Sequence, residues 1–367
     1  MLRDSVADFI TRATDIGRMR RMRAQGIDCD RALWSQIAGL GWLGVLVPED
    51  LGGLGLGLTE AAIVAEGLAS VLVPEPYAAV AVLAASALVH SGNDVLKADL
   101  LSRLVRGESL IALAWQEAAG EIDVEAVRTQ AMAFEGGYKL NGVKRYIPGA
   151  SEADGYIVSA READALALYW MPRDTSGVEV AAQTLADGRH VGTLTMQDAL
   201  VPRMQRLATG AAAVNALEAA RDHATVIAGA ELLGVMGRVL DMSLDYMRTR
   251  VQFGRPIGSF QALQHRAVDL YIQRQLASAV LDDGLRQLSE AADAKTRAIV
   301  ASRVKARCSE AGLRIAREAI QIHGAIGFTD ECDVGLYLKR ALVLASWLGN
   351  ASLHRRRYAQ LALEVEV

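Results

Sequence analysis

Apolar side chains recur with two different periods along the chain, and the changes between them divide it into three parts. Over residues 1–110 they return every three or four positions, as at Leu33 and Ile37, which predicts helices. Over 111–205 the period shortens to about two, which predicts strands. Over 206–367 the helical period returns. Runs of helices and strands segregated in this way predict an α+β protein, mostly α, in which a β domain stands between two helical domains.

Turn and cap residues predict individual elements within these parts. In the middle part, Asn141-Gly142 predicts the turn of a β-hairpin, and Tyr156–Ala160 is typical of a further strand. In the last part, Ser259 is placed to cap a helix. The helices expected there lie over Glu218–Thr249, from Ser259, over about Lys295–Ile322 and after Tyr337.

Composition removes several classes of function. With 367 residues, of which 51% are hydrophobic, the chain can bury a large core. A net charge of -4 argues against nucleic acid as a partner. Three cysteines and six histidines, with no Cys-x-x-Cys or His-x-x-x-His pair, argue against a metal site and a disulfide framework.

Apolar runs such as Tyr77–Val89 stay short of the ~20 residues that span a membrane. No targeting signal is apparent, so we expect a cytoplasmic protein without a membrane partner.

Three glycine-containing runs interrupt the predicted helices. The first, at 48–55, reads Pro-Glu-Asp-Leu-Gly-Gly-Leu-Gly. The second, Arg248–His265, contains Arg-Val-Gln-Phe-Gly-Arg-Pro-Ile-Gly-Ser-Phe-Gln, and the third, Gln321–Phe328, reads Gln-Ile-His-Gly-Ala-Ile-Gly-Phe. Taken singly, the second run is a turn between two helices and the third is a helix C-cap.

Together, and in this order, the three runs resemble the acyl-CoA dehydrogenase flavoprotein family, and the resemblance extends over essentially the whole chain. It implies an N-terminal helical domain, a middle β domain and a C-terminal four-helix bundle. It also implies an oxidoreductase acting on CH-CH bonds of an acyl-CoA thioester. The FAD of such an enzyme lies in a cleft shared between two subunits, and an electron-transfer flavoprotein is the expected electron acceptor.

The resemblance assigns cofactor contacts to side chains whose chemistry suits them. Arg250 would grip the FAD pyrophosphate through its planar guanidinium. Phe253 would pack near the flavin or the adenosine, and Gly324 would let the backbone come close to the pyrophosphate. In the family these residues reach the flavin of the neighbouring subunit. The predicted cofactor-binding residues are Arg250, Gln252, Phe253, Gln261, Gln321, Gly324 and Ala325.

The catalytic base of the family has no counterpart in this chain. The glutamate that removes the α proton commonly lies after the last glycine run, and alignment puts Leu348 there. Some family members carry it on the long helix before the Arg-x-x-Phe-Gly turn, and that position is Ala224. Glu231, two turns further on, is about 10 Å away along a helix axis and cannot replace it. We therefore predict no catalytic residue.

The flavin loop of the middle domain departs from the family as well. The family pattern is Thr-Glu-Pro-Gly-x-Gly-Ser-Asp, whereas Gln116–Asp123 has Ile122 in place of the serine. The family's Trp-Ile-Thr is replaced by a segment that ends in Pro148, which has neither a hydroxyl nor an N–H to offer.

The residues that the family uses to contact the FAD of the neighbouring subunit are thus kept. The base and the flavin-loop residues of the chain's own pocket are lost. This asymmetry favours a non-catalytic subunit of an α2β2 acyl-CoA dehydrogenase, similar to enzymes that shorten steroid side chains as CoA thioesters. Its partner would be a homologous catalytic subunit, with the acyl-CoA substrate bound in the complex. Two alternatives remain open: an active homomeric dehydrogenase with a displaced base or a flavin-dependent oxygenase of the same fold, and a structural or regulatory protein without flavin.

Overall fold

The computed structural model describes residues 1–289 and 293–363, and they form two compact units. Each unit is built from segments that lie far apart in the sequence. The first comprises Met1–Arg21, Ala62–Val73 and Thr225–Val367, and the second comprises Met22–Ala61 and Pro74–Ala224. The segregation of helices, strands and helices along the chain confirms the predicted fold class.

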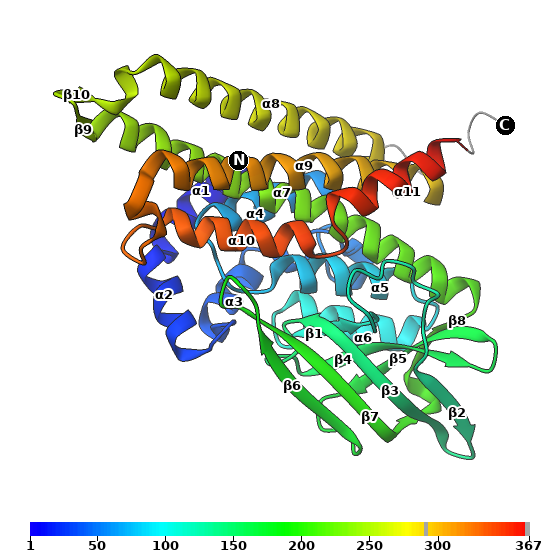
Figure 1. Ribbon diagram of the computed structural model, residues 1–367. Coiled ribbons are helices and arrows are strands. Elements are labelled where there is room, and N and C mark those ends of the chain that lie inside the picture. The colour runs from blue at the N-terminus through cyan, green and yellow to red at the C-terminus, as the bar shows by residue number, and fades with distance from the viewer. Residues whose placement is uncertain (290–292, 364–367) are drawn as a thin grey trace. The chain divides into compact units, whose positions relative to one another are not determined.

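The first unit is helical throughout, apart from one short hairpin. Its helices are α1 (Leu2–Ala13), the start of α2 (Ile16–Gln25), most of α4 (Leu58–Ser70), the second part of α7 (Ala211–Thr249), α8 (Gln261–Ser289), α9 (Ala294–His323), α10 (Val334–Ser346) and α11 (Ala351–Leu363). Helix α9 packs against α8, α10 and α11 and is buried along most of its length (Figure 1).

Two contacts fix the direction of α8 against α9. Arg266 forms an ion pair of 3.1 Å with Glu318, and Arg307 donates a hydrogen bond of 2.8 Å to Gln273. From the first contact to the second, the residue number rises along α8 and falls along α9, so the two helices are antiparallel. The beginning of α8 therefore lies beside the end of α9.

Local signals explain where these helices begin and end. Asp293 caps α9 by accepting a hydrogen bond of 2.7 Å from the Thr296 N–H, and Gly324 ends the helix with φ 65°. The prediction that Ser259 caps the next helix is wrong. Its hydroxyl donates instead to the Pro256 carbonyl, at 2.7 Å, and α8 begins at Gln261.

The second unit contains an eight-stranded sheet with helices α3 (Arg31–Gly39), α5 (Ala85–Val89) and α6 (Asp94–Val105). The strand order is β6-β7-β3-β2-β4-β5-β8, with β1 parallel to β4. The strands are β1 (Ile111–Ala114), β2 (Gln130–Phe134), β3 (Gly137–Pro148), β4 (Gly155–Glu162), β5 (Ala165–Pro172), β6 (Val178–Thr184), β7 (His190–Pro202) and β8 (Arg206–Thr209). Strands β4 and β5 are buried on both faces and read as apolar runs, whereas β6 is an exposed edge.

The strand predicted over Tyr156–Ala160 is confirmed as part of β4, but the hairpin predicted at Asn141-Gly142 is wrong. Both residues lie inside β3, where its pairing with β7 shifts register. A Cβ on Gly142 would lie 2.5 Å from the Thr129 hydroxyl oxygen. The glycine is therefore required by a close approach of two chain segments and not by a turn.

Helix α7 is the one helix among the described residues that is long and apolar enough to cross a membrane. Of its most apolar window, 83% is buried inside the protein, as in a core helix. The helix predicted over Glu218–Thr249 is confirmed as the main part of α7.

Candidate functional site

All seven residues predicted to contact a cofactor lie at one end of the helical unit. Arg250 follows α7 directly, and Gln252 and Phe253 belong to the hairpin of β9 (Val251–Gln252) and β10 (Arg255–Pro256). Gln261 is the first residue of α8. Gln321, Gly324 and Ala325 lie at the end of α9. Because α8 and α9 are antiparallel, their two ends meet here (Figure 1).

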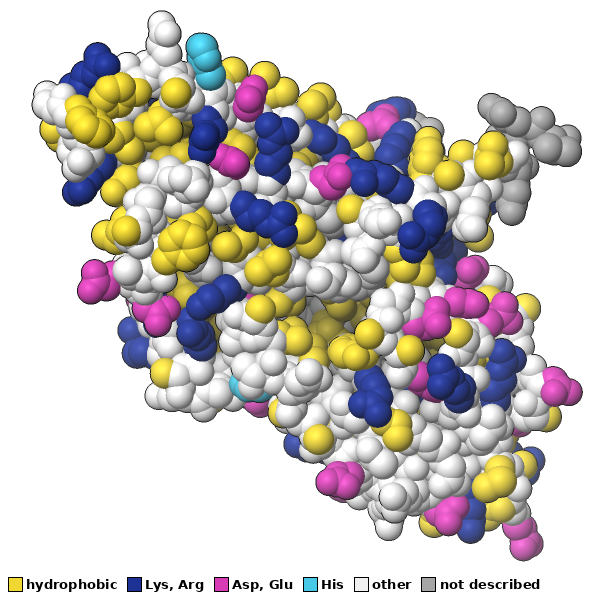
Figure 2. Space-filling view, in the orientation of Figure 1, with side chains coloured by type: hydrophobic (Ala, Val, Ile, Leu, Met, Phe, Trp, Pro, Cys, Tyr) yellow, Lys and Arg dark blue, Asp and Glu magenta, His cyan; other side chains and the backbone are white. Residues whose placement is uncertain are grey.

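The hairpin carries its aromatic side chain into solvent. Phe253 and Gly254 have φ values of 56° and 78°, the pair of left-handed residues that a tight hairpin turn requires. The Phe253 side chain is 92% exposed and touches the Phe260 ring edge-on, with 6.1 Å between centroids. Figure 2 shows apolar and basic side chains gathered at this tip. A hairpin that holds an exposed phenyl ring is suited to contact a molecule outside the chain.

Arg250 is held by its backbone and leaves its guanidinium free. Its N–H donates to the Tyr246 carbonyl and its carbonyl accepts from the Ile257 N–H, both at 2.8 Å. Among residues 1–289 and 293–363 no hydrogen bond or ion pair engages the Arg250 side chain, which is exposed. An unengaged guanidinium can bind a phosphate or pyrophosphate in two parallel hydrogen bonds.

The end of α9 is tied to α7 and is open on its outer side. The His323 ring stacks on Tyr246 with 4.4 Å between centroids, and its Nδ1 lies 2.8 Å from the Ala319 carbonyl. Gly324 adopts φ 65°, and a Cβ there would meet no described atom within 4 Å apart from its own local backbone and its chain neighbours. His323 thus has a structural role, while the backbone at Gly324 is accessible to an external group.

Leu348, at the first base position, lies in the turn between α10 and α11 and is only 1% exposed. It has φ 57°, which is uncommon for leucine. The His354 ring bonds the Leu348 carbonyl through Nε2 at 2.8 Å, and Lys305 Nζ donates to the Gly349 carbonyl at 3.0 Å. The turn is therefore held in place from two sides, but it presents no proton acceptor.

Lys305 is the residue at this turn that the sequence did not single out. It is fully buried on α9, and its Nζ also donates to the carbonyls of Leu344 and Ala345, at 2.7 and 3.1 Å. Burial lowers the pKa of Lys305 to about 7. The signal was present in the sequence, because this lysine stands among the apolar positions of α9 next to Val304 and Cys308.

Ala224, at the second base position, belongs to the other unit and is fully buried. The neighbouring carboxylate, Asp222, pairs with Arg221 at 2.9 Å. Glu231, further along α7, pairs with Arg340 at 3.2 Å. These two carboxylates are committed to ion pairs, so neither is a free general base.

In the loop at Gln116–Asp123, Glu117 is one of two carboxylates that match the family pattern, and it has a structural role. Glu117 accepts hydrogen bonds of 2.7 Å from Lys144 Nζ and from the Thr129 hydroxyl. Burial acts to raise the pKa of Glu117, but the Lys144 charge and these hydrogen bonds outweigh it, so the pKa is lowered. Lys144 is itself fully buried and also donates to Ser159, at 2.9 Å. The pair anchors the loop to the sheet.

The remaining loop positions offer little to a cofactor. The Ile122 carbonyl accepts from Arg221 at 3.1 Å, and its side chain is a hydrocarbon. Pro148 ends β3, and Tyr146 two residues earlier has φ 56°. Neither Ile122 nor Pro148 carries a side-chain hydrogen-bonding group.

The chain combines a large sheet with a helical unit that bears an exposed Arg-x-x-Phe-Gly hairpin. These are the features that the resemblance to a flavoprotein dehydrogenase implies. The model of the acyl-CoA dehydrogenase N-terminal domain matches residues 1–108, and that of the acyl-CoA dehydrogenase C-terminal domain matches residues 213–363. The chain belongs to the acyl-CoA dehydrogenase family of flavoprotein oxidoreductases, which confirms the resemblance.

Individual relatives agree with the family. The chain is 32% identical to acyl-CoA dehydrogenase FadE27 of Mycobacterium tuberculosis, over 89% of this chain and 87% of the relative. It is similar to a chain of the ChsE4-ChsE5 complex from Mycobacterium tuberculosis, with 28% identity, a TM-score of 0.88 and coverage of 99% and 96%. A structure described as a Tcur3481-Tcur3483 steroid ACAD variant also has 28% identity and a TM-score of 0.88, over 100% of this chain and 97% of that one.

Proposed function

We propose that this chain is the non-catalytic subunit of a heteromeric, FAD-dependent acyl-CoA dehydrogenase, and that it completes the FAD site of a homologous catalytic subunit. One observation carries the proposal. The guanidinium of Arg250 is exposed and unengaged by the described residues beside the solvent-facing Phe253, whereas the base positions hold the buried side chains of Leu348 and Ala224.

The surface at the hairpin end fits part of an FAD molecule. Arg250 would bind the pyrophosphate, and the open backbone at Gly324 would admit it closely. Gln261 and Gln321 would hydrogen-bond polar edges of the cofactor, and Phe253 would pack against an aromatic ring system. When bound, FAD supplies a hydride acceptor. The role of this chain is to bind and orient it.

Proton abstraction would fall to the partner. A buried leucine and a buried alanine cannot accept the α proton of a thioester, and Asp222 and Glu231 are engaged by arginines. The partner subunit would therefore supply the glutamate and the flavin loop. The acyl-CoA substrate would bind in the complex, and electrons would leave to an electron-transfer flavoprotein in the cytoplasm.

The names of the relatives support a heteromer and a steroid-type substrate. ChsE4-ChsE5 is described as a complex of two proteins, and Tcur3481-Tcur3483 is described as a steroid ACAD. We extend both properties to this chain as part of the proposal. An acyl-CoA with a steroid side chain is then the substrate class to test first.

The test is co-expression with an acyl-CoA dehydrogenase of the same organism that carries the glutamate base, followed by flavin quantitation. We expect one FAD per heterodimer and none on this chain alone. Arg250→Ala should weaken FAD retention by the complex about tenfold, since it removes a charge-assisted contact. Arg248→Ala is the matched control, because that exposed guanidinium pairs with Asp245 at 2.8 Å.

Three outcomes would contradict the proposal. A yellow, active homo-oligomer of this chain would support the homomeric alternative. Equal FAD retention by the Arg250→Ala and wild-type complexes would exclude the role assigned to Arg250. A colourless complex would favour a structural protein without flavin.

A further inference from the structure

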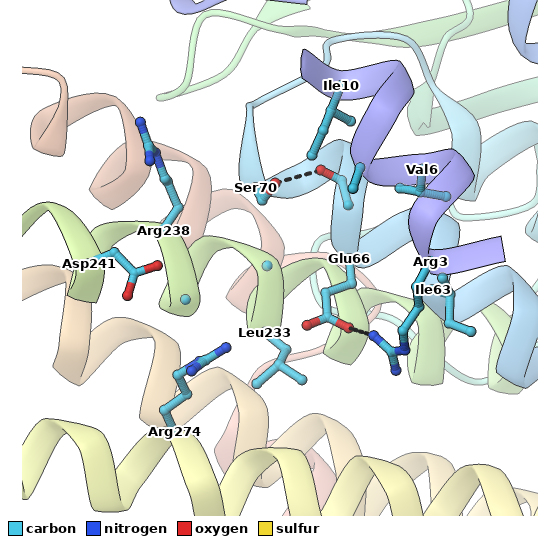
Figure 3. A pocket seen from close by; sticks show the side chains of 14 residues that line it. Arg3, Val6, Ile10, Ile63, Glu66, Ser70, Leu233, Arg238, Asp241 and Arg274 are labelled. Atoms are coloured by element: carbon cyan, nitrogen blue, oxygen red, sulfur yellow. Dashed lines mark hydrogen bonds and ion pairs between the residues drawn. The ribbon is translucent and has the colours of Figure 1, made fainter. Parts of the chain in front are cut away.

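A cavity of about 290 Å³ lies within the helical unit, away from the hairpin end, between α1, α4, α7 and α8 (Figure 3). None of the predicted cofactor residues and neither base position lines it. Its charged lining consists of Arg3, Glu66, Arg238, Asp241 and Arg274. Its volume is at the lower end of the range for ligand sites, so it suits a small molecule.

Glycines shape the walls of this cavity. A Cβ on Gly67 would lie 2.1 Å from a Val6 methyl group, and one on Gly234 would lie 2.1 Å from the Glu66 carbonyl oxygen. These contacts bring α4 close to α1 and to α7. A Cβ on Gly237 would lie 3.2 Å from the Arg274 Nη2, so the Arg274 guanidinium lies against bare backbone of α7. The position of Arg274 is thus set by the packing of its neighbours.

Arg274 is a half-buried cation without a bonded partner in the described part of the chain. Its Nε is buried and makes no hydrogen bond, and no carboxylate there forms an ion pair with it. Arg3, by contrast, is paired with Glu66 at 3.6 Å. The Arg274 charge attracts the Glu66 carboxylate and acts to lower its pKa, but the two groups form no ion pair. An anion in the cavity would supply the hydrogen bonds that the Arg274 guanidinium lacks.

The charges of the lining limit the anion to one of low charge. Three arginines face two carboxylates, which leaves a net charge of +1. Burial raises the pKa of Glu66, and Asp241 carries no bonded partner among residues 1–289 and 293–363. A dianion such as phosphate would be repelled by Asp241 and Glu66, whereas a monoanion matches the charge present.

The remainder of the lining is aliphatic. Val6 and Ile10 come from α1, Ile63 from α4 and Leu233 from α7 (Figure 3). These side chains offer a hydrocarbon surface next to the arginines. Burial of a short alkyl tail there would contribute about 0.8 kcal/mol of binding free energy per methylene.

We propose that this cavity is a binding site for a small aliphatic monocarboxylate, held at its carboxylate by Arg274 and at its tail by Val6, Ile63 and Leu233. The site shares no residue with the proposed flavin contact. It is therefore independent of the proposed function and can be tested on this chain alone.

The experiment is isothermal titration calorimetry with butyrate at neutral pH, with butyramide and inorganic phosphate as comparison ligands. We expect saturable binding of butyrate, at least about tenfold weaker binding of butyramide and phosphate, and about a tenfold loss of butyrate affinity in Arg274→Gln. Arg286→Gln is the matched control, because it removes the same charge further along α8, where Arg286 pairs with Asp283. It should bind butyrate as the wild type does.

A second variant keeps the proposal falsifiable if Arg274→Gln folds poorly. Asp241→Asn removes a negative charge that faces the anion, so it should tighten butyrate binding about two- to threefold. The proposal is wrong if the wild type does not bind butyrate, if butyramide or phosphate binds equally well, if Asp241→Asn weakens binding, or if Arg274→Gln and Arg286→Gln lose it alike. FAD retention in the heteromeric complex should be unchanged by Arg274→Gln, which separates this result from the test of Arg250.

Discussion

Lys305 shows how one side chain can organise a turn that carries a functional position in related proteins. Its Nζ donates to the carbonyls of Leu344 and Ala345, which the end of α10 leaves without helical partners, and to the Gly349 carbonyl in the turn that follows. The same burial that makes these contacts strong disfavours the charge, and the pKa of Lys305 falls to about 7. The turn is consequently sensitive to pH.

We predict that the chain becomes more stable as pH rises from about 7 to 8.5. In this window the unfolded chain keeps Lys305 protonated, with an ordinary pKa of 10.5, whereas the folded chain releases that proton above about 7. The unfolded state therefore binds more protons, and the free energy of unfolding rises by up to about 1 kcal/mol per pH unit. Urea unfolding at several pH values measures this slope.

Lys305→Met should flatten the slope, although it lowers the stability itself by leaving three carbonyls without a donor. Lys144, whose pKa burial lowers to about 8, contributes with the same sign above pH 8 in both proteins. A slope that is equal in the wild type and in Lys305→Met at pH 7 to 8 would show that Lys305 stays charged in the folded state.

The sequence identified which side chains occupy the base positions, but not what surrounds them. An alignment alone is enough to show that Leu348 occupies the position of the family's glutamate. Its positive φ and its contacts with Lys305 and His354 depend on residues that are distant in the chain. The apolar positions around Lys305 indicate that it is buried, but no local pattern indicates which carbonyls its ammonium group contacts.

At the scale of elements, the approach of α4 to α7 depends on a single missing side chain. Gly234 lies where a Cβ would be 2.1 Å from the Glu66 carbonyl oxygen and 3.2 Å from the Ser70 nitrogen. Both are backbone atoms of α4, so neither can rotate away. The two helices would have to separate to admit a methyl group.

We predict that Gly234→Ala lowers the free energy of unfolding by about 1–3 kcal/mol, the usual effect of overpacking a fixed contact. Gly335→Ala, in α10, is the control, because its Cβ would meet only the Gly327 carbonyl oxygen, at an ordinary 3.6 Å. It should be neutral or slightly stabilising, since alanine is the better helix former. Thermal unfolding of the two variants makes the comparison, and equal stability would refute the close contact.

Helices were easier to predict than strands. The long helical segments carried many periods of apolar spacing, and α9 was expected over 295–322 and lies at Ala294–His323. The prediction for β3 was wrong because Asn141-Gly142 has the composition of a turn. In the structure Gly142 lies at a register shift, where β3 passes close to Thr129. A dipeptide signal cannot distinguish these two uses of glycine.

At the scale of the whole molecule, sequence order and spatial grouping differ. The N-terminal helical part contributes α1 and most of α4 to one unit and α3, α5 and α6 to the other. Periodicity tells that a segment is helical but not which partner its apolar face will meet. The predicted domain boundaries at residues 110 and 205 follow the change in the spacing of apolar residues. They stay a prediction.

The proposed division of labour between subunits leads to a last prediction, that restoring the base alone does not make this chain an enzyme. Leu348→Glu would place a carboxylate at a position whose side chain is 1% exposed, within the turn held by Lys305. Burying the charge costs several kcal/mol unless Lys305 leaves its carbonyls to pair with it. Ile122 and Pro148 would still offer no side-chain hydrogen bond to a flavin.

We therefore expect purified Leu348→Glu to be less stable than the wild type, colourless, and without dehydrogenase turnover on any acyl-CoA. Leu348→Met is the control for packing, since it keeps the volume and brings no charge, and should cost less than about 1.5 kcal/mol. In the co-expressed complex, Leu348→Met should retain FAD as the wild type does, because Arg250 and Phe253 lie in the connection between α7 and α8, whereas Leu348 lies between α10 and α11. Flavin absorbance together with turnover by the isolated Leu348→Glu variant would mean that the chain's own pocket is intact, and the role of a non-catalytic subunit would then have to be abandoned.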